Sequence, residues 1–186
     1  LWAPQPRQKA CMRRREYEVL YGGAAGGGKS DYLLMEALRQ VTIPHYRALI
    51  LRKTSPQLRE LIDRSRTLYP FAYPGAKFRV SEGVWDFPGG AQVEFGTMQH
   101  VDDRVRYQGR RFDFIGFDEL THFTFEEYSY LFSRNRPSGP GTRCYIRATA
   151  NPGGVGHAWV KERFIDPAPP MTSIAFSSRV TAPNGQ

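Results

Sequence analysis

Apolar residues occur along the chain in two recurring patterns. Short, nearly continuous apolar runs predict strands, at residues 17–21, 48–51, 112–117 and 144–148. Apolar residues spaced three and four apart predict helices, at residues 29–41, from Ser55-Pro56 onward, at 124–133 and at 157–165. Strands that alternate with helices are typical of a mainly parallel sheet flanked by helices, so the predicted fold class is α/β.

The segment 78–98 interrupts this alternation. Strand-like pieces lie on either side of Pro88-Gly89-Gly90, which predicts a β-hairpin inserted into the α/β pattern. The chain has 186 residues, of which 40% are hydrophobic, enough for one core but hardly for two. We therefore expect a single domain over residues 1–186 with its core at about 5–166, followed by a Pro-rich tail or the start of a linker at 167–186.

A glycine-rich segment joins the first predicted strand to the first predicted helix. It fits the pattern G-x-x-x-x-G-K-[ST] with Gly23, Ala24, Ala25, Gly26, Gly27, Gly28, Lys29 and Ser30. In this pattern the backbone N–H groups surround phosphate, Lys29 reaches the β- and γ-phosphates, and the Ser30 hydroxyl ligates Mg²⁺. A flexible glycine turn is the alternative, but the strand–loop–helix context favours nucleotide binding.

Two adjacent acids, Asp118 and Glu119, directly follow the apolar strand 112–117. At this position in a P-loop ATPase, the Asp holds Mg²⁺ directly or through water, and the Glu polarises the attacking water as a general base. Such a pair could also simply cap the next helix. The phosphate loop upstream favours the catalytic interpretation, and the Glu favours an ATPase over a GTPase switch.

Other polar residues are candidates for contacts with the nucleotide. Thr149 and Asn151 follow the strand 144–148, where they would contact the attacking water or the γ-phosphate. Alternatively, Asn151 only satisfies the backbone of its own turn. Gln8, with Gln5 as its competitor, lies upstream of the first strand and is a candidate to contact the adenine edge. Arg106 is placed first among several arginines that a neighbouring subunit could supply as an arginine finger.

The charge balance adds a class of partner. The chain carries 26 Lys and Arg residues against 18 Asp and Glu, and 21 of these cations are Arg. Arginine suits bidentate phosphate contacts, so the bias favours a polyanionic partner or a nucleotide. No stretch has the roughly 18–20 apolar residues of a membrane span, no apolar signal-peptide core is present, and two cysteines make no disulfide framework. A cytoplasmic protein without a membrane partner is the default expectation.

Taken in order, four sequence blocks resemble the ATPase domain of bacteriophage large terminase subunits. The blocks are Tyr21–Ser30, Tyr107-Gln108-Gly109, Phe114–Thr121 and Ala148–Gly154, and the resemblance covers about residues 5–166. It implies a RecA-like P-loop NTPase fold of the additional-strand, catalytic-Glu class. It also implies a motor that hydrolyses ATP with Mg²⁺ and drives double-stranded DNA through a portal into a procapsid.

The resemblance further implies a homo-oligomeric ring when assembled, a monomer in isolation, a small terminase subunit as partner, and the host cell cytoplasm as location. By position, it assigns Lys29 and Ser30 to phosphate and Mg²⁺, Asp118 to the Mg²⁺ ligand and Glu119 to the base. Thr149-Ala150-Asn151 becomes the motif that couples hydrolysis to movement, and Gln8 the adenine contact. Two features depart from the family: the phosphate loop lacks an Arg that many members carry, and no nuclease domain is expected in this chain.

Two other functions remain as alternatives. Another P-loop DNA motor, such as a helicase or recombinase ATPase, would show unwinding or strand exchange, although the lack of a second RecA-like domain speaks against a two-domain helicase. A non-hydrolysing DNA-binding module would use the glycine loop to hold backbone phosphate and would show no saturable ATP binding.

Overall fold

A single mixed sheet forms the centre of the computed structural model, which describes residues 2–23, 26–166 and 173–175. Its strands are β1 (Glu18–Gly22), β2 (Arg47–Arg52), β3 (Lys77–Arg79), β4 (Val84–Asp86), β5 (Gln92–Thr97), β6 (Phe114–Phe117), β7 (Tyr145–Ala150) and β8 (Ser173–Ala175). Within the described residues they lie in the order β3-β4-β5-β2-β6-β7-β1-β8. From β5 to β8 all neighbours pair in parallel, whereas β3, β4 and β5 pair antiparallel.

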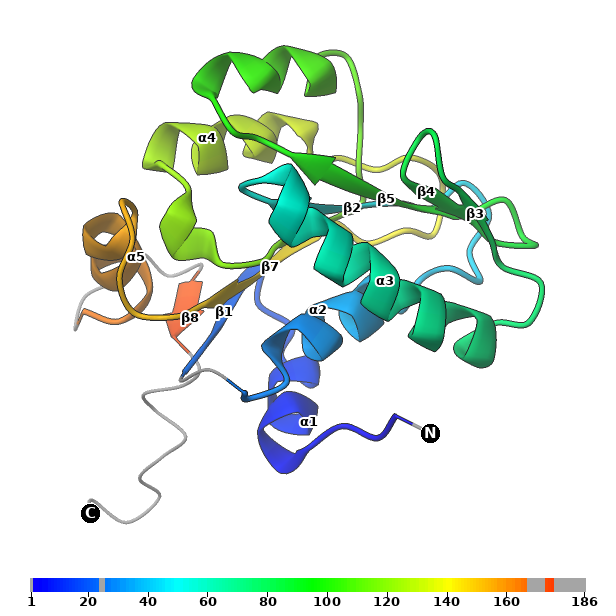
Figure 1. The fold of residues 1–186 in the computed structure, drawn as a ribbon, viewed down its shortest axis with the longest axis horizontal. Helices are drawn as coiled ribbons and strands as arrows, with labels where there is room; N and C mark the ends of the chain where they lie inside the picture. Colours follow the sequence, from blue (N-terminus) through cyan, green and yellow to red (C-terminus); the bar gives the residue numbers. More distant parts are fainter. Residues whose placement is uncertain (1, 24–25, 167–172, 176–186) are drawn as a thin grey trace.

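Helices cover both faces of this sheet. They are α1 (Pro6–Met12), α2 (Lys29–Ala37), α3 (Ser55–Ala72), α4 (Phe125–Tyr130) and α5 (His157–Phe164), with 3₁₀ helices η1 (Val101–Tyr107), η2 (Leu120–His122) and η3 (Leu131–Arg134). Figure 1 shows α1, α2 and α3 on one side of the sheet, and α4 and α5 away from them. In the part of the chain that the structure describes, no helix combines the length and apolarity needed to cross a bilayer.

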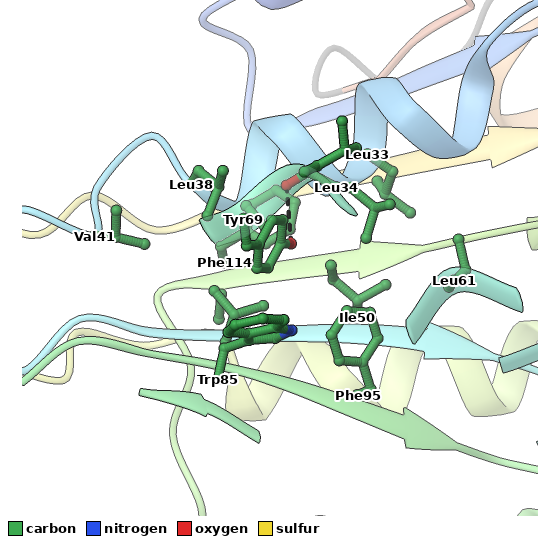
Figure 2. Close-up of a cluster of buried hydrophobic side chains, with 14 of the residues drawn as sticks. Leu33, Leu34, Leu38, Val41, Ile50, Leu61, Tyr69, Trp85, Phe95 and Phe114 are labelled. Atoms are coloured by element: carbon green, nitrogen blue, oxygen red, sulfur yellow. Dashed lines mark hydrogen bonds between the residues drawn. The ribbon is translucent and has the colours of Figure 1, made fainter. Parts of the chain in front are cut away.

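Alternate strand residues supply two separate hydrophobic cores. Ile50 of β2 and Phe114 of β6 face α2 and α3, whereas their neighbours Leu51 and Ile115 face α4, η1 and α5. Figure 2 shows the first core, where the Tyr69 hydroxyl of α3 donates to the Leu34 carbonyl of α2 at 3.0 Å. Both faces of the parallel strands are therefore buried, which explains why these strands appear in the sequence as continuous apolar runs.

The strand order brings together segments that are distant in sequence. β7 lies between β1 and β6, so the acids after β6 are separated from the phosphate loop after β1 by one strand. Because these three strands are parallel, their carboxyl ends meet at the same edge of the sheet. Ligands of open α/β sheets bind at this edge.

Most predicted elements are present, with shifted ends. The predicted helix 29–41 ends as α2 at Ala37, because the following residues form tighter i→i+3 turns that keep Leu38 and Val41 buried at helical spacing. The predicted helix 124–133 continues beyond α4 as η3. The hairpin around Pro88-Gly89-Gly90 joins β4 to β5. The sequence patterns did not predict α1 or η1, and of the predicted tail only β8 lies within the described residues.

Candidate active site

The phosphate loop runs from the end of β1 to the first residue of α2, Lys29. Gly28, the N-cap of α2, has φ of +64°, a backbone conformation that residues other than glycine rarely adopt. The Lys29 ammonium donates to the Gly23 carbonyl at 3.2 Å, across the mouth of the loop. A cavity of about 380 Å³ lies here, lined by Gln5, Arg7, Tyr21, Gly22, Gly23, Gly26, Gly27 and Lys29. The predicted loop residues Ala24 and Ala25 lie outside the described residues.

Gln8 supports this loop from the side of α1. Its side chain is buried, its amide nitrogen donates to the Gly28 carbonyl at 2.7 Å, and its amide oxygen accepts from the Gln5 N–H at 2.7 Å. A Cβ atom at Gly28 would lie 2.5 Å from the Gln8 amide nitrogen. A larger residue at position 28 would therefore displace the Gln8 side chain. In this arrangement Gln8 fixes the loop, while its predicted contact with adenine stays a prediction.

A second, larger cavity adjoins the loop. It measures about 590 Å³ and is lined by Trp2, Ala3, Gln5, Gln8, Gly28, Asp31, Met35, Arg64, Thr67, Leu68, Phe71 and Ala72. The exposed side chain of Gln5 therefore borders both cavities. A mixture of aromatic, aliphatic and polar walls beside a phosphate loop is suited to a nucleobase and its sugar.

Asp118 is buried where β6 ends, beside the start of α2. The Ser30 hydroxyl donates to its Oδ2 at 3.4 Å, and the Thr149 hydroxyl donates to its Oδ1 at 2.5 Å. Burial raises the pKa of Asp118, while the Arg52 charge and the hydrogen bond from Thr149 act in the opposite direction. The structure thus brings the two predicted Mg²⁺ ligands, Ser30 and Asp118, together.

Glu119 occupies a strained backbone position. Its φ of +58° lies in the left-handed region, which costs a non-glycine residue about 1–3 kcal/mol. The Glu119 N–H donates to the Thr149 hydroxyl oxygen at 3.1 Å, and the Asn151 amide donates to Glu119 Oε1 at 2.7 Å. The Asn151 side chain therefore orients the predicted base rather than satisfying its own turn. Its Oδ1 atom is buried and accepts no hydrogen bond from the described residues.

Arg52, at the end of β2, is a site residue that the sequence analysis missed. Its side chain is 11% exposed, and its guanidinium lies 3.1 Å from Asp118 Oδ2 and 3.4 Å from Glu119 Oε1. A single cation therefore contacts both predicted catalytic acids. Lys29 is a second cation nearby: burial lowers the pKa of its ammonium, and the charges of Glu119 and Asp118 oppose this effect.

Arg106, the predicted arginine finger, lies apart from these residues on η1. Its side chain is 65% exposed and lies 3.5 Å from Asp103. Within the described residues, it forms no ion pair with Asp118 or Glu119. An exposed position is what a residue needs if it is to reach a neighbouring subunit's nucleotide, so its role stays a prediction.

The donor set at this edge fits Mg²⁺ held jointly with a nucleotide. Among the described residues, no group of three or more His, Cys, Asp and Glu side chains could hold a metal ion alone. Ser30 and Asp118 supply the hard oxygen ligands that Mg²⁺ prefers, and Mg²⁺ in phosphate-transfer sites takes its remaining ligands from phosphate and water. The ion would neutralise charge on the phosphates.

The fold and the placement of the loop, the acids and β7 are those of the RecA-like P-loop NTPase fold, with an additional strand between the phosphate-loop strand and the acidic strand. The chain belongs to the family of large terminase subunits of the T4-like-virus type, N-terminal part, whose model matches residues 20–186. Both the predicted fold class and the predicted family are thereby confirmed.

Solved structures share this fold at low sequence identity. The large terminase ATPase domain of Thermus phage P74-26 is 16% identical with a TM-score of 0.67, covering 94% of this chain and 80% of that one. The large terminase of a thermophilic bacteriophage is 15% identical with a TM-score of 0.71, and other structures of it hold ATP-gamma-S or ADP. That match covers 91% of this chain but only 44% of the terminase.

A third structure extends the fold to another packaging protein. The N-terminal domain of the DNA packaging ATPase from bacteriophage phi29 is 13% identical with a TM-score of 0.61, covering 90% of this chain and 93% of that domain. None of the curated protein sequences matches this chain.

Proposed function

We propose that the chain is a Mg²⁺-dependent ATPase that powers the movement of double-stranded DNA into a viral procapsid. Membership of the large terminase family supports the packaging role, and the complexes of a similar terminase with ATP-gamma-S and ADP support the nucleotide. The observation that carries the proposal is the hydrogen-bonded group at the carboxyl ends of β6 and β7. There Thr149 holds Asp118, and Asn151 holds Glu119.

The residues of this group, together with those of the phosphate loop, have separate parts in the proposed reaction. Lys29 and the loop backbone bind the β- and γ-phosphates, while Ser30 and Asp118 hold the metal ion. Glu119 takes a proton from the attacking water, and Asn151 orients the Glu119 carboxylate with its amide nitrogen.

The base of ATP is proposed to lie in the 590 Å³ cavity beside Gln5 and Gln8. This position lets the triphosphate enter the smaller cavity of the phosphate loop, because Gln5 borders both spaces. The proposed partners are double-stranded DNA held by its backbone, the portal and procapsid, the small terminase subunit, and further copies of this chain in a ring.

Two substitutions test the ATPase proposal. Lys29→Ala should abolish ATP binding, because the loop loses its phosphate-binding cation. Glu119→Gln should keep ATP binding and lower kcat by about 10²–10⁴-fold, the usual contribution of a general base. Filter binding of labelled ATP with Mg²⁺ and phosphate release at saturating ATP measure the two effects. Wild-type turnover in Glu119→Gln would show that Glu119 is not the base.

The trans role of Arg106 requires a different measurement. If Arg106 acts on a neighbour's nucleotide, turnover per subunit should rise with protein concentration, and Arg106→Ala should remove that rise. Arg111→Ala, which also removes an exposed arginine, is the matched control. A rate per subunit that is independent of concentration, up to levels at which rings form, would argue against trans activation.

A further inference from the structure

A strongly basic groove lies at the opposite edge of the sheet from the candidate active site. It has a volume of about 800 Å³ and is lined by Lys9, Met12, Arg13, Arg14, Arg15, Arg39 and Arg143. These residues belong to the end of α1, the link from α1 to β1, the turn after α2 and the segment before β7. The groove therefore lies where the parallel strands β1 and β7 begin, whereas the acids lie where β6 ends.

The positive charge of this groove is mostly unbalanced. Among the described residues that line it, six are cations and none is an acid. Arg14 lies 3.5 Å from Glu16 and Arg39 lies 3.2 Å from Glu36, but in the described ranges Lys9, Arg13, Arg15 and Arg143 have no carboxylate within 4.0 Å. Exposed cations crowded together repel one another, so a groove of this kind favours a polyanionic ligand.

Hydrogen bonds hold the segments of the groove in place. The Gln40 amide donates to the Arg143 carbonyl at 2.9 Å and accepts from the Arg143 N–H at 2.7 Å. The Arg143 guanidinium also donates to the Arg15 carbonyl, and the Arg39 guanidinium to the Met12 carbonyl. The cations are thus presented by segments fixed to one another, although they come from distant parts of the sequence.

A buried arginine holds the backbone of the Arg13–Arg15 segment from the side of the core. Arg147 of β7 is 1% exposed and donates to the carbonyls of Arg14 and Glu16, each at 3.1 Å. The side chains of Arg13 and Arg15 are exposed. A buried side chain of the core thus holds the backbone that carries the exposed cations of the groove.

We propose that this groove binds the phosphodiester backbone of duplex DNA. The identity of the polyanion rests on the proposed function, whereas the position, charge and rigidity of the groove come from the structure. Arginine forks suit phosphate oxygens, and the described residues of the lining include no aromatic side chain on which an unpaired base could stack. Duplex DNA is therefore favoured over single strands. Because the groove and the phosphate loop lie at opposite edges of the sheet, DNA and nucleotide bind without competing.

The double variant Arg13→Gln/Arg15→Gln tests this surface, because both side chains are exposed. Each phosphate contact contributes about 0.9 to the slope of log K against log salt, so its loss weakens binding about eightfold at about 0.1 M salt. Loss of both contacts should therefore weaken binding roughly 60-fold. The double variant Arg59→Gln/Lys77→Gln removes the same charge from exposed positions on α3 and β3 and serves as control.

Fluorescence anisotropy of a labelled mixed-sequence duplex, across a salt series, measures these affinities in the 186-residue chain. The proposal is supported if the groove variant loses affinity and salt slope while the control variant keeps both. Equal losses in the two variants would overturn it, as would absence of duplex binding by the wild type. Competition by polyglutamate, with no binding of duplex, would instead indicate an acidic protein partner and would also overturn it.

Binding of labelled ATP in the same samples separates this proposal from the ATPase proposal. The groove variant should bind ATP like the wild type, which also shows that it is folded. Wild-type protein that binds duplex but not ATP would contradict the proposed ATPase and leave the groove assignment standing. Protein that binds ATP but has no groove-dependent duplex binding would contradict only the groove.

Discussion

The two edges of the parallel sheet use arginine in opposite ways. At the carboxyl edge, Arg52 lies among Asp118 and Glu119, and charges of both signs are enclosed by hydrogen bonds. At the amino edge, Arg13 and Arg15 are exposed and without acidic partners among the described residues. A net charge alone does not distinguish these uses. The burial of the charges and the balance of their signs distinguish the two uses. A buried cluster of opposite charges suits chemistry at one phosphate, and an exposed cluster of cations suits binding of a polyanion.

The two arginines that are least exposed at these edges, Arg147 and Arg52, also differ in what they contact. Arg147 contacts Glu36 at 3.8 Å inside the core and donates to backbone carbonyls, so its contacts join parts of the fold. Arg52 instead contacts two acids that are predicted to bind metal and activate water. We therefore expect loss of Arg147 to affect mainly stability and loss of Arg52 to affect mainly turnover.

The largest expected effect is that of Arg147→Met on stability. The substitution leaves the fully buried Glu36 with Arg39 as its remaining cationic partner and removes the bonds to the Arg14 and Glu16 carbonyls. We expect the free energy of unfolding to fall by about 3 kcal/mol, the lower end for breaking a buried ion pair. Urea denaturation followed by circular dichroism measures this change.

The half-exposed Arg39 provides the matched control for that experiment. Arg39→Gln removes the other cation beside Glu36 and should cost under about 1 kcal/mol, because its charge is largely solvated. Equal losses of stability in the two variants would show that burial does not separate the roles of these arginines.

An intermediate effect is expected for Arg52→Gln on turnover. Partners that orient a metal-binding carboxylate typically contribute 10–100-fold to activity, so we expect kcat/KM to fall by about that factor. Arg52→Lys, which keeps the charge but not the two-sided contact, should recover part of the loss. Steady-state phosphate release measures both variants, and unchanged kcat/KM in Arg52→Gln would place Arg52 outside the catalytic group.

The smallest expected effect is a shift in the pH profile of Thr149→Val. Asp118 is predicted to work ionised, so activity is lost as pH falls through its pKa, which burial raises and the Thr149 hydrogen bond lowers. Removal of that hydrogen bond raises the pKa of Asp118 further, so the acid limb of kcat/KM should move to higher pH.

Rates measured across the acid range, with Thr142→Val at the amino edge as control, test this shift. Thr142 donates its hydroxyl to the Gly139 carbonyl and contacts neither acid. An acid limb that stays in place, or moves to lower pH, would contradict the proposed dependence on ionised Asp118.

Local sequence signals predicted the parts of the site that lie within one element or one turn. The phosphate loop and the Asp118–Glu119 pair were identified from residues adjacent in sequence. Helix α1 also had a local signal, because Pro6 stands in its first turn and Gln5 and Gln8 form reciprocal bonds there. The Pro-, Gln- and Arg-rich composition of residues 1–16 obscured that signal.

The remaining parts depend on pairing between distant strands. Arg52 enters the site because β2 pairs with β6, and no spacing along the chain indicates that pairing. The basic groove likewise requires Arg143 to lie beside Arg15, a contact set by the pairing of β1 with β7. The excess of arginine is visible in the sequence, but only the tertiary structure distinguishes the buried arginines from the exposed ones.

The position of β7 between β1 and β6 also has a consequence for synthesis on the ribosome. In the described structure the two neighbours of β1 are β7 and β8, which are synthesised after the other six described strands. A nascent chain that ends before β7 carries the phosphate loop on a strand without its inner neighbour and leaves one edge of β6 unpaired. Such late, long-range pairing is slow and exposes strand edges. The nucleotide site is thus complete only after β7 has been synthesised and has paired with β1 and β6, so ATP bound at the complete site cannot assist the steps before that pairing.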